Sequence, residues 1–306
     1  MDITVAIHSM LVLFLLLAVG YGARKCKVFD GDSDTLLTRL LLNITIPALL
    51  ITAVMGGPTD LPRSYLFYFM LVSLLAFVIK GALGFLSAVV LRIPRTDRGT
   101  VTAMIMFGNV GFMGLPIVNA LFGPEGLFIA VLLNVVFNFL VFSLAIKLVA
   151  GGGAAKVTFR QFLNAPMLSS LLAFILILLG ARLPEMLYVA MDHLGGMTTP
   201  LAMLLLGSTL AAMPVREIFQ DWRVYIIVGI KLLLVPLAVY LVLIQFVTDP
   251  MLLSVVVVLS AMPVATSLPM LCIQYGGNHA LVGRGIFIST VLAMVTIPLL
   301  TPLFQL

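Results

Sequence analysis

Ten long apolar runs, separated by short polar or turn-forming breaks, determine what this chain of 306 residues can fold into. Each run holds about 20 residues, which is the length of an α-helix that crosses a bilayer. Because 62% of the residues are hydrophobic and only 9% are charged, no water-soluble core could cover them. The sequence therefore predicts an all-α polytopic membrane protein with ten transmembrane helices. We expect the spans at residues 4–22, 36–54, 65–91, 100–122, 125–149, 166–183, 197–213, 222–247, 251–275 and 279–304.

The distribution of basic residues predicts the orientation in the membrane. Of the 17 lysines and arginines, thirteen fall on one side of the ten-span arrangement, and only Arg63 and Arg182 fall on the other. The side that is richer in positive charge is cytoplasmic, so both termini are expected outside. The net charge of +5 then reflects membrane orientation, and it gives no indication of nucleic-acid binding.

An internal repeat divides the chain. The glycine-rich stretch GGGAAK predicts a cytoplasmic linker over residues 150–165, between two halves of five spans each, 1–149 and 166–306. Shifting the first half by 153 residues places Leu115–Pro116 on Leu268–Pro269, in equivalent spans. Because five is an odd number, the two halves must cross the membrane in opposite directions. Inverted repeats of this kind are typical of secondary transporters.

Two spans contain residues that interrupt a helix at membrane depth: span 4 holds GNVGFMGLPIVNALFG (108–123), and span 9 holds SAMPVATSLPMLCIQYGG (260–277). Proline removes a backbone donor, glycine lowers helix propensity, and unpaired backbone groups cannot face lipid. Two broken helices that cross at the midplane would present half-helix N-termini and side-chain donors to an anion. The alternative is a pair of kinked structural helices. The candidate residues are Asn109, Gly111, Gly114, Pro116, Pro263, Thr266, Ser267 and Pro269.

Four further polar residues lie inside predicted spans. Lys80 and Lys231 are near the middle of spans 3 and 8, and no Asp or Glu lies at a comparable depth. We expect their partner to be an incoming anion or a backbone carbonyl at a helix break; the alternative is a snorkelling or neutral lysine. Asn134 and Asn138 share one face of span 5. They either line the same cavity or form interhelical hydrogen bonds.

Several functional classes are excluded by what the sequence lacks. No carboxylate pair lies at membrane depth, which excludes a dyad-type sodium–proton exchanger and an aspartyl intramembrane protease. His8, His193 and His279 lie near span ends, and no G-x-S-x-G, H-E-x-x-H or P-loop pattern occurs. We therefore expect no enzymatic activity, no metal site and no cofactor. Coupling to Na⁺, coupling to H⁺ and uniport driven by the membrane potential all stay open.

The run N-V-G-F-M-G-L-P at 109–116 resembles the fourth-helix motif of the auxin efflux carrier family, which includes plant PIN auxin exporters and bacterial permeases for malate or malonate. The segments N-I-T-I-P-A-L-L at 43–50 and T-T-P-L-A at 198–202, and the two prolines of span 9, are also similar. The resemblance covers all ten spans.

This resemblance implies a ten-helix inverted repeat with broken, crossing helices 4 and 9. It implies a scaffold of helices 1, 2, 6 and 7, often dimeric, and a transport domain of helices 3–5 and 8–10 that moves like an elevator. By matching position, Asn109 would bind the substrate carboxylate, Pro116 and a span 9 proline would shape the crossover, and Lys80 would lie near the site. The chain departs from plant members at Ala76, where they have an aspartate, and in a linker of only about fifteen residues.

These observations together predict a secondary transporter of a small organic anion such as malate, malonate or an auxin-like acid, in the bacterial inner membrane. The expected partners are the anion, the lipid bilayer and a second copy in a homodimer. The alternative is a membrane receptor or sensor that retains a transporter fold without transport.

Overall fold

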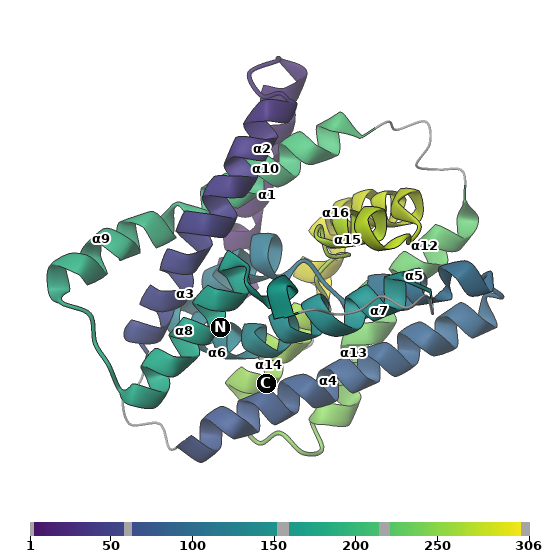
Figure 1. Ribbon diagram of the computed structural model, residues 1–306. Coiled ribbons are helices and arrows are strands. Elements are labelled where there is room, and N and C mark those ends of the chain that lie inside the picture. The colour runs from purple at the N-terminus through teal and green to yellow at the C-terminus, as the bar shows by residue number, and fades with distance from the viewer. Residues whose placement is uncertain (1–2, 58–62, 152–158, 214–220, 301–306) are drawn as a thin grey trace. The chain divides into compact units, whose positions relative to one another are not determined.

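The computed structural model describes residues 3–57, 63–151, 159–213 and 221–300, and within them every regular element is a helix (Figure 1). Seven helices are long and apolar enough to cross a membrane, and two shorter helices are also apolar. This confirms the predicted all-α polytopic membrane protein, whereas the ten-span inverted repeat stays a prediction. The seven are Ile7–Lys25, Gly31–Met55, Ser64–Val90, Val110–Val149, Glu185–Ala212, Trp222–Leu243 and His279–Leu300.

The chain packs into two compact units, each built from three separate stretches. Unit 1 comprises Met1–Met70, Gly111–Val135 and Leu163–Met213. Unit 2 comprises Leu71–Val110, Val136–Phe162 and Pro214–Leu306. Most of the predicted linker, residues 152–158, lies outside the described residues, and η4 (Phe159–Phe162) follows it as a short 3₁₀ helix.

In unit 1, α1 (Ile3–Lys25) packs along α10 (Thr198–Ala212) because glycines let the two backbones approach. A Cβ atom at Gly20 would overlap the backbone of Leu204, and one at Gly207 would overlap the backbone of Leu17. Small residues at helix interfaces are a common way to pack helices in a membrane. The other contacts of unit 1 join α3 (Ile46–Met55) to α8 (Ala165–Leu179) and α9 (Glu185–Gly196).

The helix α2 (Gly31–Leu40) begins at an N-cap aspartate, Asp30, whose carboxylate accepts from the backbone N–H of Ser33 at 2.7 Å. The Ser33 hydroxyl also donates to it, at 2.7 Å. These bonds, the backbone one first, hold the pKa of the Asp30 carboxyl below its usual value. The cap therefore contributes stability above the pKa of the unfolded chain, and that contribution is lost as the pH falls through the folded pKa.

We expect Asp30→Ala to lower the thermal unfolding temperature at pH 7, because it leaves orphan N–H groups at the start of α2. The difference from wild type should shrink at a pH below the folded pKa of Asp30, where the wild-type carboxyl is also protonated. Differential scanning fluorimetry in nanodiscs across this pH range measures the effect. Asp30→Asn is the matched control, because asparagine caps a helix without titrating; a gap between Asp30→Ala and wild type that is equal at both pH values would contradict the prediction.

Three π-helical segments each stand two residues before a proline: η1 (Leu41–Thr45), η2 (Val110–Gly114) and η5 (Ile230–Leu234). The prolines are Pro47 in α3, Pro116 in α6 (Leu115–Leu140) and Pro236 in α13 (Val235–Leu243). A proline cannot donate to the carbonyl one turn earlier, and its ring crowds that carbonyl. A wider i→i+5 turn before the proline accommodates this, so these prolines deform their helices locally without ending them.

Unit 2 is built around two short helices that are buried over most of their length. From Thr100 to Met106 every residue of α5 (Arg95–Met106) is buried, and so is every residue of α14 (Pro250–Ser260) from Leu252 onward. A helix that is buried on all sides lies in the core of its unit. The surrounding elements of this unit are α4 (Arg63–Val90), η3 (Val141–Ala145), α7 (Ile146–Val149), α12 (Trp222–Gly229), α13, α15 (Leu268–Tyr275) and α16 (His279–Leu300).

Candidate functional site

The two core helices of unit 2 are interrupted, and the interruptions cross each other. The first of these helices, α5, ends at Met106, and the other, α14, ends at Ser260. Beyond these ends, Gly108 and Val264 form an antiparallel bridge. Its bonds run from Asn109 N to Pro263 O at 2.8 Å and from Ala265 N to Phe107 O at 3.2 Å. Two of the N–H groups that the breaks release therefore find acceptors in the opposite segment, as burial requires.

Local sequence explains why the chain can cross there. A Cβ atom at Gly108 would lie 3.1 Å from Met262 Cβ and 3.3 Å from Met262 O, so a larger residue would push the segments apart. Pro263 has no N–H to leave unpaired. Val264 N donates to the Ser289 hydroxyl of α16 at 3.0 Å, which fixes the second segment to a continuous helix.

The break in span 4 lies before the proline that was expected to shape it. Phe107 has extended backbone angles (φ −103°, ψ 121°), and the chain is helical again by Val110. Pro116 is the second residue of α6, and Gly111 and Gly114 lie in the π-helical turn before it. These three residues belong to unit 1. The interruption thus follows from the glycine and asparagine at 108–109, and the proline acts only on the turn that follows.

Asn109 is the most suitable binding group at this crossing. Its side chain is 4% exposed, and its Oδ1 accepts from the Thr266 hydroxyl at 3.5 Å. Among the described residues its Nδ2 has no hydrogen-bond acceptor, although that atom is buried. Leaving a buried donor unpaired costs about 1–3 kcal/mol. A carboxylate oxygen of a bound anion would remove this cost.

Backbone donors accompany this amide at the start of α15. Leu268 N donates to Ala265 O at 3.2 Å, whereas the N–H groups of Thr266 and Ser267 have no acceptor within the described parts of the chain. Thr266 is half-buried and Ser267 is exposed. Free N–H groups at a helix N-terminus favour negative charge. Pro269, as the second residue of α15, suits this helix start.

Lys80 lies beside the same crossing, within a cluster of aromatic rings. The residue is 6% exposed, and its Nζ lies 3.6 Å from the centroid of the Phe77 ring. That ring in turn contacts Phe107, in the break itself, with 5.7 Å between centroids, and Phe137 at 6.3 Å. A cation over an aromatic face is stabilised by about 1–2 kcal/mol when it is desolvated.

Lys231 lies at the end of the other broken helix. It is 1% exposed, and its Nζ donates to the backbone oxygen of Ser260, the last residue of α14, at 3.4 Å. Its partner is thus a backbone carbonyl at a helix break, one of the two partners that the sequence indicated. Lys231 belongs to the π-helical turn η5.

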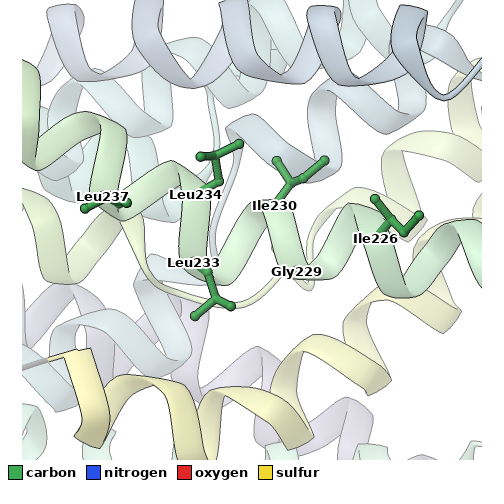
Figure 2. Close-up of a pocket in the computed structure, with 6 residues that line it drawn as sticks. All are labelled: Ile226, Gly229, Ile230, Leu233, Leu234 and Leu237. Carbon is green, nitrogen blue, oxygen red and sulfur yellow. The ribbon is translucent and has the colours of Figure 1, made fainter.

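The helical stretch that contains Lys231 also has an apolar face, which Figure 2 shows. An open, shallow pocket of about 410 Å³ runs along α12, η5 and α13, and Figure 2 shows only hydrocarbon side chains and a glycine lining it. Such a stripe has no group that could hold an anion, and it suits contact with lipid chains. The lining residues are Ile226, Gly229, Ile230, Leu233, Leu234 and Leu237.

The two asparagines of span 5 differ in their surroundings. Asn134, in unit 1, donates from Nδ2 to the Ser170 hydroxyl of α8 at 3.3 Å. This is the interhelical hydrogen bond that was the alternative to cavity lining. Asn138 is 5% exposed and belongs to unit 2.

Unit 2 therefore assembles eight of the twelve predicted residues, and unit 1 contains the other four. Sequence reasoning missed Ser289, a fully buried serine in α16, because its hydroxyl becomes significant only once Val264 N lies beside it. Among the described residues no three His, Cys, Asp or Glu side chains gather at one point. The eight residues are Lys80, Asn109, Asn138, Lys231, Pro263, Thr266, Ser267 and Pro269.

An all-helical membrane chain with two crossing interrupted helices has the features of a membrane transporter. The chain belongs to the membrane transport protein family, whose sequence model matches residues 5–158 and 154–301. This match confirms the resemblance to auxin efflux carriers.

Two relatives align along nearly the whole chain. An uncharacterized transporter of Methanothermobacter thermautotrophicus is 29% identical over 311 residues, covering 98% of this chain and 97% of the relative. A protein of Rhizobium meliloti with the name "Putative malonate transporter" is 26% identical over 303 residues, covering 94% of this chain and 92% of the relative. The similarity thus extends over both units.

Proposed function

We propose that this protein is a secondary transporter of a small organic anion, a carboxylate such as malonate, malate or an auxin-like acid. The observation that carries the proposal is the buried, unpaired Nδ2 of Asn109 at the crossing of two interrupted helices. Lys80 and the free N–H groups of Thr266 and Ser267 supply further positive potential in the same unit. The name of the Rhizobium meliloti relative supports a short dicarboxylate as the first substrate to test.

We further propose an elevator-type mechanism in which unit 2 moves and unit 1 stays fixed. Unit 1 contains the residues of predicted spans 1, 2, 6 and 7, and unit 2 contains those of spans 8, 9 and 10 and of span 3 from Leu71 onward. This division supports a scaffold and a transport domain of the predicted kind. The stretch Gly111–Val135 packs with unit 1, although the sequence assigned it to the transport domain.

The proposed topology is ten spans in two inverted repeats, with both termini outside the inner membrane, in a homodimer. The repeat is supported by the positions of the breaks, because a shift of 153 residues carries Met106, the end of α5, to within one residue of Ser260, the end of α14. It is also supported by Lys80 and Lys231, two buried lysines at nearly the same offset.

Uptake into proteoliposomes tests the function directly. Radiolabelled malonate, malate and indole-acetate are offered with ion gradients and membrane potential varied, and at least one should accumulate above empty liposomes. If none moves and none shifts the unfolding temperature, the transporter proposal is wrong. If an anion raises the unfolding temperature but does not move, the receptor or sensor alternative is favoured.

A further inference from the structure

The buried amino group of Lys231 has an unusual partner for a lysine at membrane depth. Its bond partner among the described residues is a single backbone oxygen, that of Ser260. The last carbonyls of a helix have no partner within that helix, and together they carry a partial negative charge. The amino group therefore lies where α14 is most negative.

In the described part of unit 2, no carboxylate is placed by the sequence near the end of α14, where the amino group of Lys231 lies. That part contains three acidic residues, Asp97, Asp221 and Asp249, and each stands at the start of a helix. Asp249 precedes Ser260 by eleven residues, or about 16 Å of helix, and Asp221 precedes Lys231 by ten, or about 15 Å. Within the described part of unit 2, the amino group of Lys231 thus faces the end of α14, and neither Asp221 nor Asp249 lies near it along its helix.

A free carbonyl at the end of a broken helix is the kind of group that coordinates a coupling cation in transporters of this architecture. In unit 2 the amino group of Lys231 already donates a hydrogen bond to the carbonyl of Ser260. An inorganic cation would have to displace a side chain that is 1% exposed and anchored in the same unit.

We propose that Lys231 occupies the place of an inorganic coupling cation at the end of α14, so that anion transport does not require Na⁺. The inference rests on the proposed anion transport. It adds the identity of the group that offsets the partial negative charge at the end of α14. Lys231 is a positioning residue in this account: it holds the end of α14 and thereby the segment 261–267 that faces Asn109.

The test compares wild type with Lys231→Ala and Lys231→Met. Malonate uptake is measured in NaCl, KCl and choline chloride, each with and without ethylammonium. Wild-type uptake should agree within twofold in the three salts. Malonate uptake by Lys231→Ala should be at least tenfold lower than that of wild type. Ethylammonium should restore part of this uptake by entering the vacated space. Uptake by Lys231→Met should fall as far, but ethylammonium should not restore it, because the methionine side chain fills that space.

A second readout separates this inference from the transport proposal. Ethylammonium should raise the thermal unfolding temperature of Lys231→Ala and leave that of Lys231→Met and wild type unchanged, and this requires no transport. A fivefold or greater dependence of wild-type uptake on Na⁺ would overturn the inference while leaving anion transport in place. Equal responses of the two variants to ethylammonium in the unfolding measurement would also overturn it. Absence of any anion uptake, with the unfolding result as expected, would overturn only the transport proposal.

Discussion

Asn109→Ala should weaken the binding of the transported anion at least tenfold while leaving the empty protein as stable as wild type. The loss follows from the removal of a hydrogen bond to a charged group, which contributes about 1.5–3 kcal/mol. The unchanged stability follows from the structure of the empty site. The Nδ2 of Asn109 is buried without an acceptor among the described residues, so its removal deletes an unsatisfied donor. Among the described residues, the one side-chain hydrogen bond that is lost is the long contact with the Thr266 hydroxyl, at 3.5 Å.

The anion-induced rise in unfolding temperature and the concentration dependence of uptake measure this effect. Asn119→Ala is the matched control, because Asn119 is an exposed amide in the same predicted span and should change neither quantity. If Asn109→Ala binds the anion as tightly as wild type, Asn109 is not part of the site. If it lowers the unfolding temperature of the empty protein by several degrees, the side chain has a structural role instead.

Gly207→Ala should lower the stability and the yield of folded protein. A single added methyl group would overlap the backbone of Leu17 and lie close to Tyr21 N, and neither backbone atom can rotate away. Overpacking of this kind costs about 1–3 kcal/mol or more. This cost outweighs the gain of about 1 kcal/mol that alanine normally brings to a helix. We expect the unfolding temperature to drop by about 2 °C or more for each net kcal/mol that is lost.

The matched control is Gly22→Ala in α1, where an added Cβ would meet nothing within 4 Å. That variant should be as stable as wild type or slightly more stable, because only the propensity term changes. Thermal unfolding and the yield of monodisperse protein after size-exclusion chromatography measure both variants. Equal behaviour of the two glycines would show that α1 and α10 do not approach as closely as the structure indicates.

The position of the candidate site was accessible from sequence because helix breakers are rare signals in apolar spans. Asn109 and the segment 263–269 stand out as polar and proline-containing stretches, and the structure joins them in one crossing. The place of the break in span 4 was not accessible. Proline predicts a break, but a π-helical turn before Pro116 absorbs its effect, and the chain opens instead at Gly108. The residues at which the helix is interrupted depend on the segment that pairs with them, here 263–265.

Residue roles that depend on a partner from another part of the chain were also beyond the sequence. Asn134 and Asn138 look alike in a helical projection, yet Asn134 donates to Ser170 of α8. Ser289 carries no motif, and it matters only because Val264 N donates to it. Each of these roles is set by a contact between residues at least 25 positions apart, which local spacing does not encode.

The sequence by itself determined that this chain is an all-α membrane protein of the transport family, because bilayer thickness and the cost of unpaired backbone groups leave an apolar chain few alternatives. It also indicated which two spans are interrupted, although not the residue at which span 4 opens. The tertiary structure decided that the two weak points pair with each other, that Lys231 is bound to the end of α14, and that one amide hydrogen-bond donor on Asn109 is left free. These features arise from distances between segments that are far apart in the sequence, and such distances are fixed only when the helices pack.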